Sequence, residues 1–281
     1  MSLRVSFATE SGSAMVPNED AVVATPNAVV VVDGVTAPTS LDTGCMHGTP
    51  WYASTLAAEI VAVLSREPAA DLKWALAQAL TTVAAGHAST CDLSAPGTPS
   101  GTVAIAREAD TSLDYLVLSD ATVAIRKADG VQVINDNRIG DLFSDLRQAV
   151  QAAPVDSVER ELRLVELVTT QRKLRNVEGG YWLAGAIPEA AEHALVGAVP
   201  LGEVRVAAAM SDGASRLVDL FASQDWAAAL DRLKERGPVD WIRRTRHIED
   251  SDIGATRWPR YKRSDDATIA CVQFDWSVGE R

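Results

Sequence analysis

The amino-acid sequence predicts an α+β protein in which antiparallel β-sheets carry helices on their faces. Strand-like and helical runs come in blocks, rather than in the regular β-α-β alternation that builds a parallel sheet. An Ala-Asp-Gly turn between the runs "ATVAIRK" and "GVQVIN" indicates a hairpin of antiparallel strands. The chain has 281 residues and shows no fixed-period repeat, low-complexity tract or Pro/Ser-rich linker. Residues 1–281 are therefore expected to form a single domain.

Three short β-rich runs come first, separated by turn residues in "SGSAMVPN" and "TPN". They are residues 4–9, 20–25 and 28–33. The third, "AVVVVD", is apolar without polar alternation, which predicts a strand buried on both faces. It ends in the carboxylate of Asp33, which is costly to bury unless a partner compensates its charge. Asp33 therefore either opens a turn at Gly34 or helps to hold a cation.

Two Ala-rich helices are expected after these strands. In the first, residues 48–64, Thr49 is the expected N-cap and Pro50 takes the first helical position. The second runs from Asp71 to Ala88. Such helices are typical of close packing on a sheet or on each other.

The rest of the chain returns to strands and then becomes mainly helical. Further strands are expected at residues 102–108, 113–120, 121–127, 130–135, 203–212 and 267–276. Helical periodicity covers residues 139–170, 214–223, 225–236 and 238–250.

Charge and composition exclude several classes of partner and site. The net charge of −12 gives a surface that repels nucleic acid and anionic membranes, so neither is an expected partner. No apolar run is long enough to span a bilayer, and no signal peptide is recognisable. Cys45, Cys91 and Cys271 are far apart and form no CxxC pair, which favours a reduced, cytoplasmic location over a disulfide framework or a zinc ribbon. Without a histidine or cysteine cluster, zinc in a nitrogen or sulfur site is not expected.

Acidic residues recur where strands begin or end. They are Glu19, Asp20, Asp33, Asp120, Asp212, Asp265 and Asp266. A single Asp-Gly pair is most often only a turn. If the strands are neighbours, however, all of these carboxylates meet at one rim of the sheets. Mg²⁺ and Mn²⁺ prefer oxygen ligands of this kind, so the pattern predicts a divalent metal site.

Six segments resemble, in order, the motif series of the metal-dependent type 2C serine/threonine protein phosphatases, the PPM family. They are "PNED", "VVVVDGV", "SGT", "LVLSDATVAI", "AAAMSDGASRLVD" and "KRSDDATIACV". The resemblance extends from about residue 18 to residue 274. It implies a four-layer αββα sandwich of two antiparallel sheets flanked by helices, which agrees with the order of elements above.

The resemblance also implies a role for each acid. Asp33 would bridge two Mn²⁺ or Mg²⁺ ions, and the carbonyl of Gly34 would bind one of them. Glu19 would serve that same metal, with Asp20 orienting its water shell. Asp212 and Asp265 would hold the other metal. The two ions would lower the pKa of a bridging water that attacks a phosphoserine or phosphothreonine, with Asp33 and Asp20 central to catalysis.

The role of the motif acid Asp120 is less defined, and Ser100 to Thr102 match a strand-start motif. In other places the sequence departs from the family pattern. An Arg that grips phosphate in many members falls near Met15, and the family's "DGHGG" reads "DGVTAP". Ser119 stands at a glycine position. His47 either stands near the site or is structural. Arg216 replaces an acid of a third metal site, so a third metal is not expected.

The sequence predicts an active, cytoplasmic Mn²⁺- or Mg²⁺-dependent phosphatase acting on phosphorylated proteins. Arg216 either contacts the substrate phosphate or is a solvated helix residue. A small phosphorylated molecule is the alternative substrate. The alternative function is a catalytically weak or inactive phosphatase-like module that binds metal and regulates.

Overall fold

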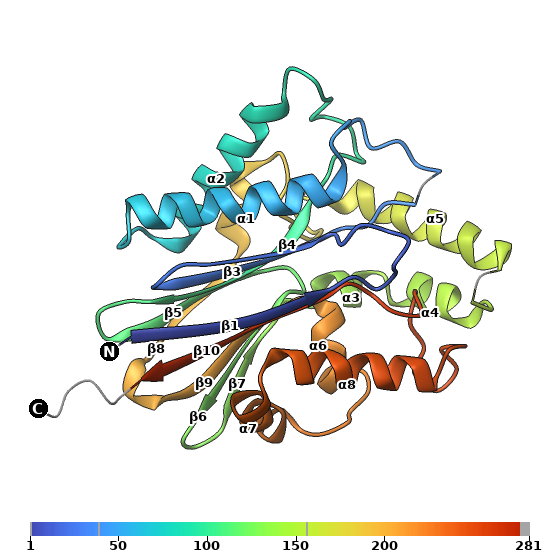
Figure 1. Ribbon diagram of the computed structural model, residues 1–281. Helices are drawn as coiled ribbons and strands as arrows, with labels where there is room; N and C mark the ends of the chain where they lie inside the picture. The colour runs from blue at the N-terminus through green and yellow to red at the C-terminus, as the bar shows by residue number, and fades with distance from the viewer. Residues whose placement is uncertain (1, 39, 156, 276–281) are drawn as a thin grey trace, which may run out of the picture.

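The computed structural model describes residues 2–38, 40–155 and 157–275, and these form a four-layer sandwich (Figure 1). Two five-stranded antiparallel sheets pack face to face, and helices cover their outer faces. The α+β architecture expected from the sequence is therefore confirmed. None of the helices in the described part of the chain is long and apolar enough to cross a membrane.

The first sheet has the strand order β2-β3-β4-β5-β8 and lies under two helices. Its strands are β2 (Asp20–Ala24), β3 (Ala28–Gly34), β4 (Gly101–Glu108), β5 (Ser112–Leu118) and β8 (Leu195–Pro200). The helices are α1 (Gly48–Arg66) and α2 (Leu72–His87). Ala53, Ala57, Ala75 and Ala79 of these helices are buried, and their small side chains allow the backbones to approach the sheet closely.

The second sheet has the order β1-β10-β9-β6-β7, and its outer face carries three helices. Its strands are β1 (Ser2–Glu10), β6 (Thr122–Lys127), β7 (Val131–Ile134), β9 (Val204–Met210) and β10 (Ala267–Asp275). Its helices are α6 (Asp212–Asp219), α7 (Trp226–Arg236) and α8 (Pro238–Ser251). The predicted hairpin is confirmed, because β6 pairs antiparallel with β7.

A third group of helices lies at one end of the sandwich, between the ends of the two sheets (Figure 1). It consists of α3 (Arg138–Leu142), α4 (Ser144–Ala152) and α5 (Val158–Leu174). It has a small apolar core of its own around Phe143, Val150 and Leu167. The helical region predicted for residues 139–170 is therefore correct in type, but it is divided into three helices.

Three short elements differ from the prediction. Strand β8 was not expected, because "LVGAVP" contains a glycine and a proline and shows no clear alternation; it is the edge strand beside β5. Two 3-10 helices, Pro188–His193 and Leu201–Glu203, flank it.

The prediction that Thr49 caps α1 is wrong, because α1 begins at Gly48 and His47 occupies the cap position without a capping bond. Helix α2 begins one residue after the predicted start, and Asp71 is its N-cap, since the carboxylate of Asp71 accepts a hydrogen bond from Trp74 N.

Candidate metal centre

Strand β3 places Asp33 in the interface between the two sheets. Side chains alternate along a strand, and Val29 and Val31 face the second sheet, whereas Val30 and Val32 face α1 and α2. Asp33 continues the row that begins at Val29, so its carboxylate also points between the sheets. Asp20 lies directly opposite Asp33 in the β2–β3 register and shares that face.

Three more aspartates lie at the same place. Two of them adjoin strands of the second sheet, and the third lies in the turn that connects the two sheets. Asp212 begins α6 just after β9, Asp265 precedes β10, and Asp120 lies in the turn between β5 and β6. The backbone N–H of Asp212 donates to Asp33 Oδ2 at 3.4 Å. Asp20, Asp33, Asp120, Asp212 and Asp265 are called the acidic cluster below. All of them except Asp20 line one cavity of about 220 Å³.

The turn that carries Asp120 depends on an uncommon backbone conformation. Ser119, at the glycine position noted above, has φ of 64°, in the left-handed region that side chains other than glycine adopt at a cost. Its carbonyl accepts a hydrogen bond from Asp136 N at 3.1 Å, which helps to hold the turn.

Three members of the acidic cluster are held in an environment that disfavours their charge. Burial, reinforced by neighbouring carboxylates, raises the pKa of Asp33 well above its usual range. Burial also raises the pKa of Asp20 and of Asp120 to about 7. The negative charge of the Asp212 carboxylate contributes to the raised pKa of both Asp33 and Asp120. The group is therefore short of positive charge.

Asp20 gives the most direct sign of a missing partner. Among the described residues, neither of its buried carboxylate oxygens has a hydrogen-bond partner. The side chains of Ser211 and Thr268 lie near Asp20 and lower its pKa, but each hydroxyl also has another partner, because Ser211 donates to the carbonyl of Thr268 and the Thr268 hydroxyl pairs with that of Thr9. The hydroxyl of Thr102, opposite Asp33 in the β3–β4 register, is likewise buried and without a partner. Such a set of oxygen donors fits a hard divalent cation.

Asp265 is in the opposite electrostatic state. Arg216 Nη2 lies 2.6 Å from Asp265 Oδ2, and Lys262 Nζ lies 2.9 Å from Asp265 Oδ1. Burial alone would raise the pKa of Asp265, but these two cations outweigh it and hold that pKa well below its usual range. Arg216 also lies 3.5 Å from Asp212. The reading of Arg216 as a solvated helix residue is wrong, since its side chain is buried against both carboxylates.

Gly34 lines the cavity, and Glu19, which does not line it, lies beside Gly34. The N–H of Gly34 donates to the carbonyl of Glu19 at 3.1 Å, and a Cβ at position 34 would come within 2.6 Å of that oxygen. The Thr36 hydroxyl donates to the Glu19 carboxylate and accepts from Lys262 Nζ at 2.8 Å. Burial raises the pKa of Glu19, although Thr36 and Lys262 lower it. Glycine is thus required at position 34 by close packing.

Asp266 has a structural role rather than a place in the cavity. Its carboxylate accepts hydrogen bonds from the backbone N–H groups of Gly12 and Glu19, at 2.8 and 2.6 Å. It therefore fixes the segment before β2, including the backbone of Glu19.

Sequence reasoning missed two cations that line the same cavity. Arg147 of α4 and Lys262 face it together with the acidic cluster, and the α5 residues Leu164, Leu167 and Val168 form an apolar wall. The Arg147 guanidinium lies 5.2 Å from the ring centre of Tyr261. Lys262 begins the segment "KRSDDATIACV", three positions before Asp265, but its role was not recognised there, whereas only the fold brings Arg147 to the acids. The cavity combines metal-binding oxygens with groups that can bind an anion.

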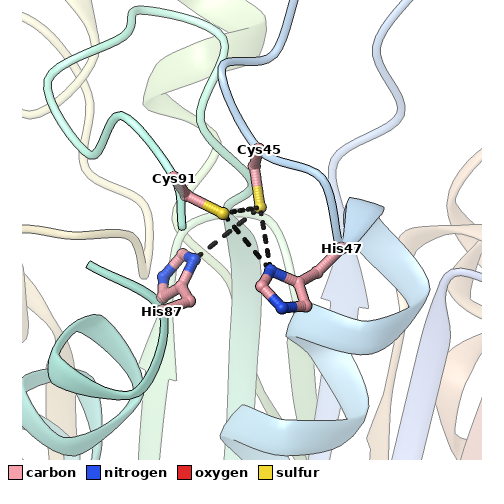
Figure 2. Close-up of side chains that lie close together, drawn as sticks. All are labelled: Cys45, His47, His87 and Cys91. Carbon is pink, nitrogen blue, oxygen red and sulfur yellow. Dashed lines mark hydrogen bonds between the residues drawn. The ribbon is translucent and has the colours of Figure 1, made fainter. Parts of the chain in front are cut away.

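The prediction that the chain has no cysteine-histidine cluster is wrong. His47 does not line the cavity; it lies beside Cys45, His87 and Cys91 (Figure 2). Residues 45–47 and 87–91 are more than 40 positions apart, so no local motif announces the group.

Comparison with solved structures identifies the fold. No protein-family model matches the sequence, and no curated protein does. The catalytic domain of the serine/threonine phosphatase PstP in complex with two manganese ions has 16% identity and a TM-score of 0.56, and the match covers 97% of this chain and 98% of that one. The PPM phosphatase MsPP from Mycobacterium smegmatis, in complex with cacodylate, gives the same four values. Stp1 from Staphylococcus aureus has 13% identity and a TM-score of 0.55, over 97% of this chain and 95% of that one. The chain therefore has the fold of the PPM-type serine/threonine phosphatases.

Proposed function

We propose that the chain is a Mn²⁺- or Mg²⁺-dependent phosphatase that hydrolyses phosphoserine and phosphothreonine in proteins. The observation that carries the proposal is the acidic cluster, in which the buried Asp20 carboxylate has no hydrogen-bond partner among the described residues while two cations, Arg147 and Lys262, line the adjoining cavity. The likeness to PPM-type phosphatases, one of them in complex with two manganese ions, supports the same reading.

The metals would be held by the ligands predicted from the sequence, which lie in the cavity or beside it. Asp33, the carbonyl of Gly34 and Glu19 would hold one ion, and Asp33, Asp212 and Asp265 the other. Bound divalent ions would supply a water of lowered pKa and neutralise charge on the phosphoryl oxygens. Asp20 is buried opposite Asp33, and neither of its carboxylate oxygens has a hydrogen-bond partner in the described part of the chain, so it would accept hydrogen bonds from that hydration shell.

The second ion would have to compete with cations already present. Asp265 is bonded to Arg216 and Lys262, so its oxygens become available to a metal only when these side chains release them. Lys262 is the more mobile of the two, since its side chain is 42% exposed and that of Arg216 is 11% exposed. Arg216 therefore sets the cost of loading this position.

The substrate phosphate would be bound by Arg147 and Lys262. Both are long cationic donors on the wall of the cavity, and they would take the part of the phosphate-binding arginine that the segment around Met15 lacks. The apolar residues of α5 would exclude water from the bound phosphoryl group. No cysteine is among the residues that line the cavity, so attack by a metal-activated water requires no covalent phospho-cysteine.

The compartment proposed is the cytoplasm. Cys45 Sγ and Cys91 Sγ lie 3.2 Å apart without a disulfide, which suits a reducing environment.

The test is turnover against metal concentration. Wild-type protein should hydrolyse a phosphothreonine peptide or p-nitrophenyl phosphate when Mn²⁺ is added, and Asp33→Asn should lower kcat/KM by at least about 10²-fold, as for the loss of other preorganised electrostatic groups. Asp110→Asn, an exposed acid in the turn after β4, is the matched control and should leave turnover unchanged.

Absence of metal-dependent turnover across a broad panel of phosphopeptides and metabolite phosphates would refute the proposal. If calorimetry then still detected tight Mn²⁺ binding, the chain would be a phosphatase-like binding module instead. Competition between the two classes of substrate in the same panel would decide between a protein and a small-molecule substrate.

A further inference from the structure

A second group of metal-ligating side chains lies outside the acidic cluster. Cys45 and His47 belong to the segment that joins β3 to α1, His87 is the last residue of α2, and Cys91 lies four positions later. Figure 2 shows the four side chains converging from these two segments. Their ligand atoms, two sulfurs and two ring nitrogens, all lie within 4.8 Å of one another.

The sulfur–nitrogen distances within this group match a tetrahedral metal site. Cys45 Sγ lies 3.7 Å from Nδ1 of both His47 and His87. Cys91 Sγ lies 3.3 Å from His47 Nδ1 and 3.2 Å from Cys45 Sγ. A tetrahedral Zn²⁺ ion with Zn–S of about 2.3 Å and Zn–N of about 2.0 Å places a sulfur and a nitrogen about 3.5 Å apart and two sulfurs about 3.8 Å apart. The two sulfurs are therefore closer together than in a loaded site and would have to separate by about 0.6 Å when the ion binds. A disulfide would require about 2.05 Å between the sulfurs.

The surrounding structure holds the ligands in place without a metal. The ring of His47 stacks on Trp51 with 4.3 Å between the ring centres, and Trp51 lies 5.1 Å from the ring of His87. The His87 side chain is buried. The helical hydrogen-bond pattern of α2 extends past His87, because the N–H of Cys91 donates to the carbonyl of His87 at 3.0 Å.

The two ligand-bearing segments are also joined through their backbones. The N–H of Asp92 donates to the carbonyl of Gly44 at 2.8 Å. Gly44 has φ of 67°, and a Cβ there would lie 2.5 Å from that of Ala95, so only glycine allows this approach. The contact brings Cys45 and Cys91 to one place.

We propose that Cys45, His47, His87 and Cys91 bind one structural Zn²⁺ ion. Two thiolates and two neutral imidazoles carry the charge that balances a divalent ion, and a sulfur and nitrogen tetrahedron is the donor set that selects zinc. All four positions are filled by protein, so the site is closed and has no place for a reacting water. It fastens the segment that follows Asp33 and Gly34 to the end of α2. The proposal does not depend on the phosphatase activity.

The experiment measures zinc in the full chain after removal of any affinity tag. Protein produced with added zinc and purified under reducing conditions should contain about one equivalent of zinc. An organomercurial reagent should release this zinc as it binds the cysteine thiolates. Cys45→Ser and Cys91→Ser should each remove most of the zinc. Cys271→Ser, at the third cysteine in β10, is the matched control and should retain it. Asp33→Asn should also retain it, which separates this site from the acidic cluster.

A second measurement uses wild-type protein, so it does not depend on the folding of a variant. Replacing zinc by Co²⁺ should produce a thiolate-to-cobalt charge-transfer band and the visible bands of tetrahedral cobalt. The proposal is overturned if the wild-type chain binds neither Zn²⁺ nor Co²⁺ under reducing conditions. It is equally overturned if mass spectrometry finds a Cys45–Cys91 disulfide in the freshly isolated, anaerobically handled protein in place of the metal.

Discussion

Neighbouring carboxylates of the candidate site are held in opposite states by single side chains. Asp20 has no cation beside it, and burial raises its pKa to about 7. Asp265 belongs to the same acidic cluster, yet Arg216 and Lys262 keep it ionised. Removing one residue therefore changes which carboxylates carry charge, and hence which of them are open to a metal.

Arg216 is expected to stabilise the metal-free protein and to oppose metal loading. Arg216→Gln removes a buried cation from between Asp212 and Asp265, which should lower the free energy of unfolding without metal by about 3–5 kcal/mol. The same change should lower the Mn²⁺ concentration needed for half-maximal activity, because Asp265 no longer has to be released. Denaturant unfolding in EDTA and an activation curve with Mn²⁺ measure the two effects.

The matched control is Arg232→Gln, which breaks an exposed ion pair with Asp240 and should cost less than about 1 kcal/mol. If Arg216→Gln instead left the Mn²⁺ requirement unchanged and raised KM for the phosphopeptide, Arg216 would be a substrate contact rather than a competitor of the metal.

Among the elements, helices α4 and α5 determine what the cavity can bind. They contribute Arg147 and an apolar wall, whereas β3 and β4 contribute Asp33, Gly34 and Thr102. Arg147→Ala should raise KM for a phosphopeptide about 10-fold or more, since an ionic hydrogen bond to phosphate is worth roughly 1.5–3 kcal/mol, with a smaller effect on kcat. Initial-rate kinetics at saturating Mn²⁺ would measure both constants.

Arg163→Ala is the control for this change, because Arg163 lies on the exposed side of α5 and pairs only with Glu159 among the partners described for it. Equal losses in both variants would mean that Arg147 acts through helix stability. A lower kcat with unchanged KM would remove it from the phosphate-binding role.

The elements also show how far the sequence alone could lead. The unbroken apolar run before Asp33 predicts a two-faced strand, and β3 is one because both of its faces pack against core. The edge strand β8 could not be predicted, since only pairing with β5 makes its irregular sequence extended. The position of Arg147 and the pairing of residues 45–47 with 87–91 depend on the packing of distant segments, which no local pattern encodes.

On the scale of the whole molecule, the acidic cluster joins the two sheets. Asp20 and Asp33 come from the first sheet, and Asp212 and Asp265 adjoin the second. In the absence of metal their repulsion acts across the interface that forms the core of the sandwich. Metal binding is therefore expected to stabilise the entire domain and not only the rim.

The stability of the metal-free protein should fall as pH rises from about 4 to about 7. Asp20 and Asp120 have a pKa of about 7 in the folded protein and 3.8 as the ordinary value. Below pH 4 both states bind these protons, so the stabilisation is fully present; it is lost as the pH passes through the folded pKa. Each group contributes a slope of about 1.4 kcal/mol per pH unit in this window. The raised pKa values of Asp33 and Glu19 act in the same direction.

Saturating Mn²⁺ should reverse this trend, because the ion binds the ionised carboxylates and excludes their protons. Asp265 does not disturb the measurement, since a depressed pKa loses its stabilising contribution only below about pH 4. Thermal unfolding in EDTA and in Mn²⁺ between pH 5 and pH 8 tests both parts. Asp20→Asn should flatten the EDTA curve, and Asp110→Asn should not. A metal-free protein whose stability rises across this range would show that the acidic cluster is neutralised without a metal.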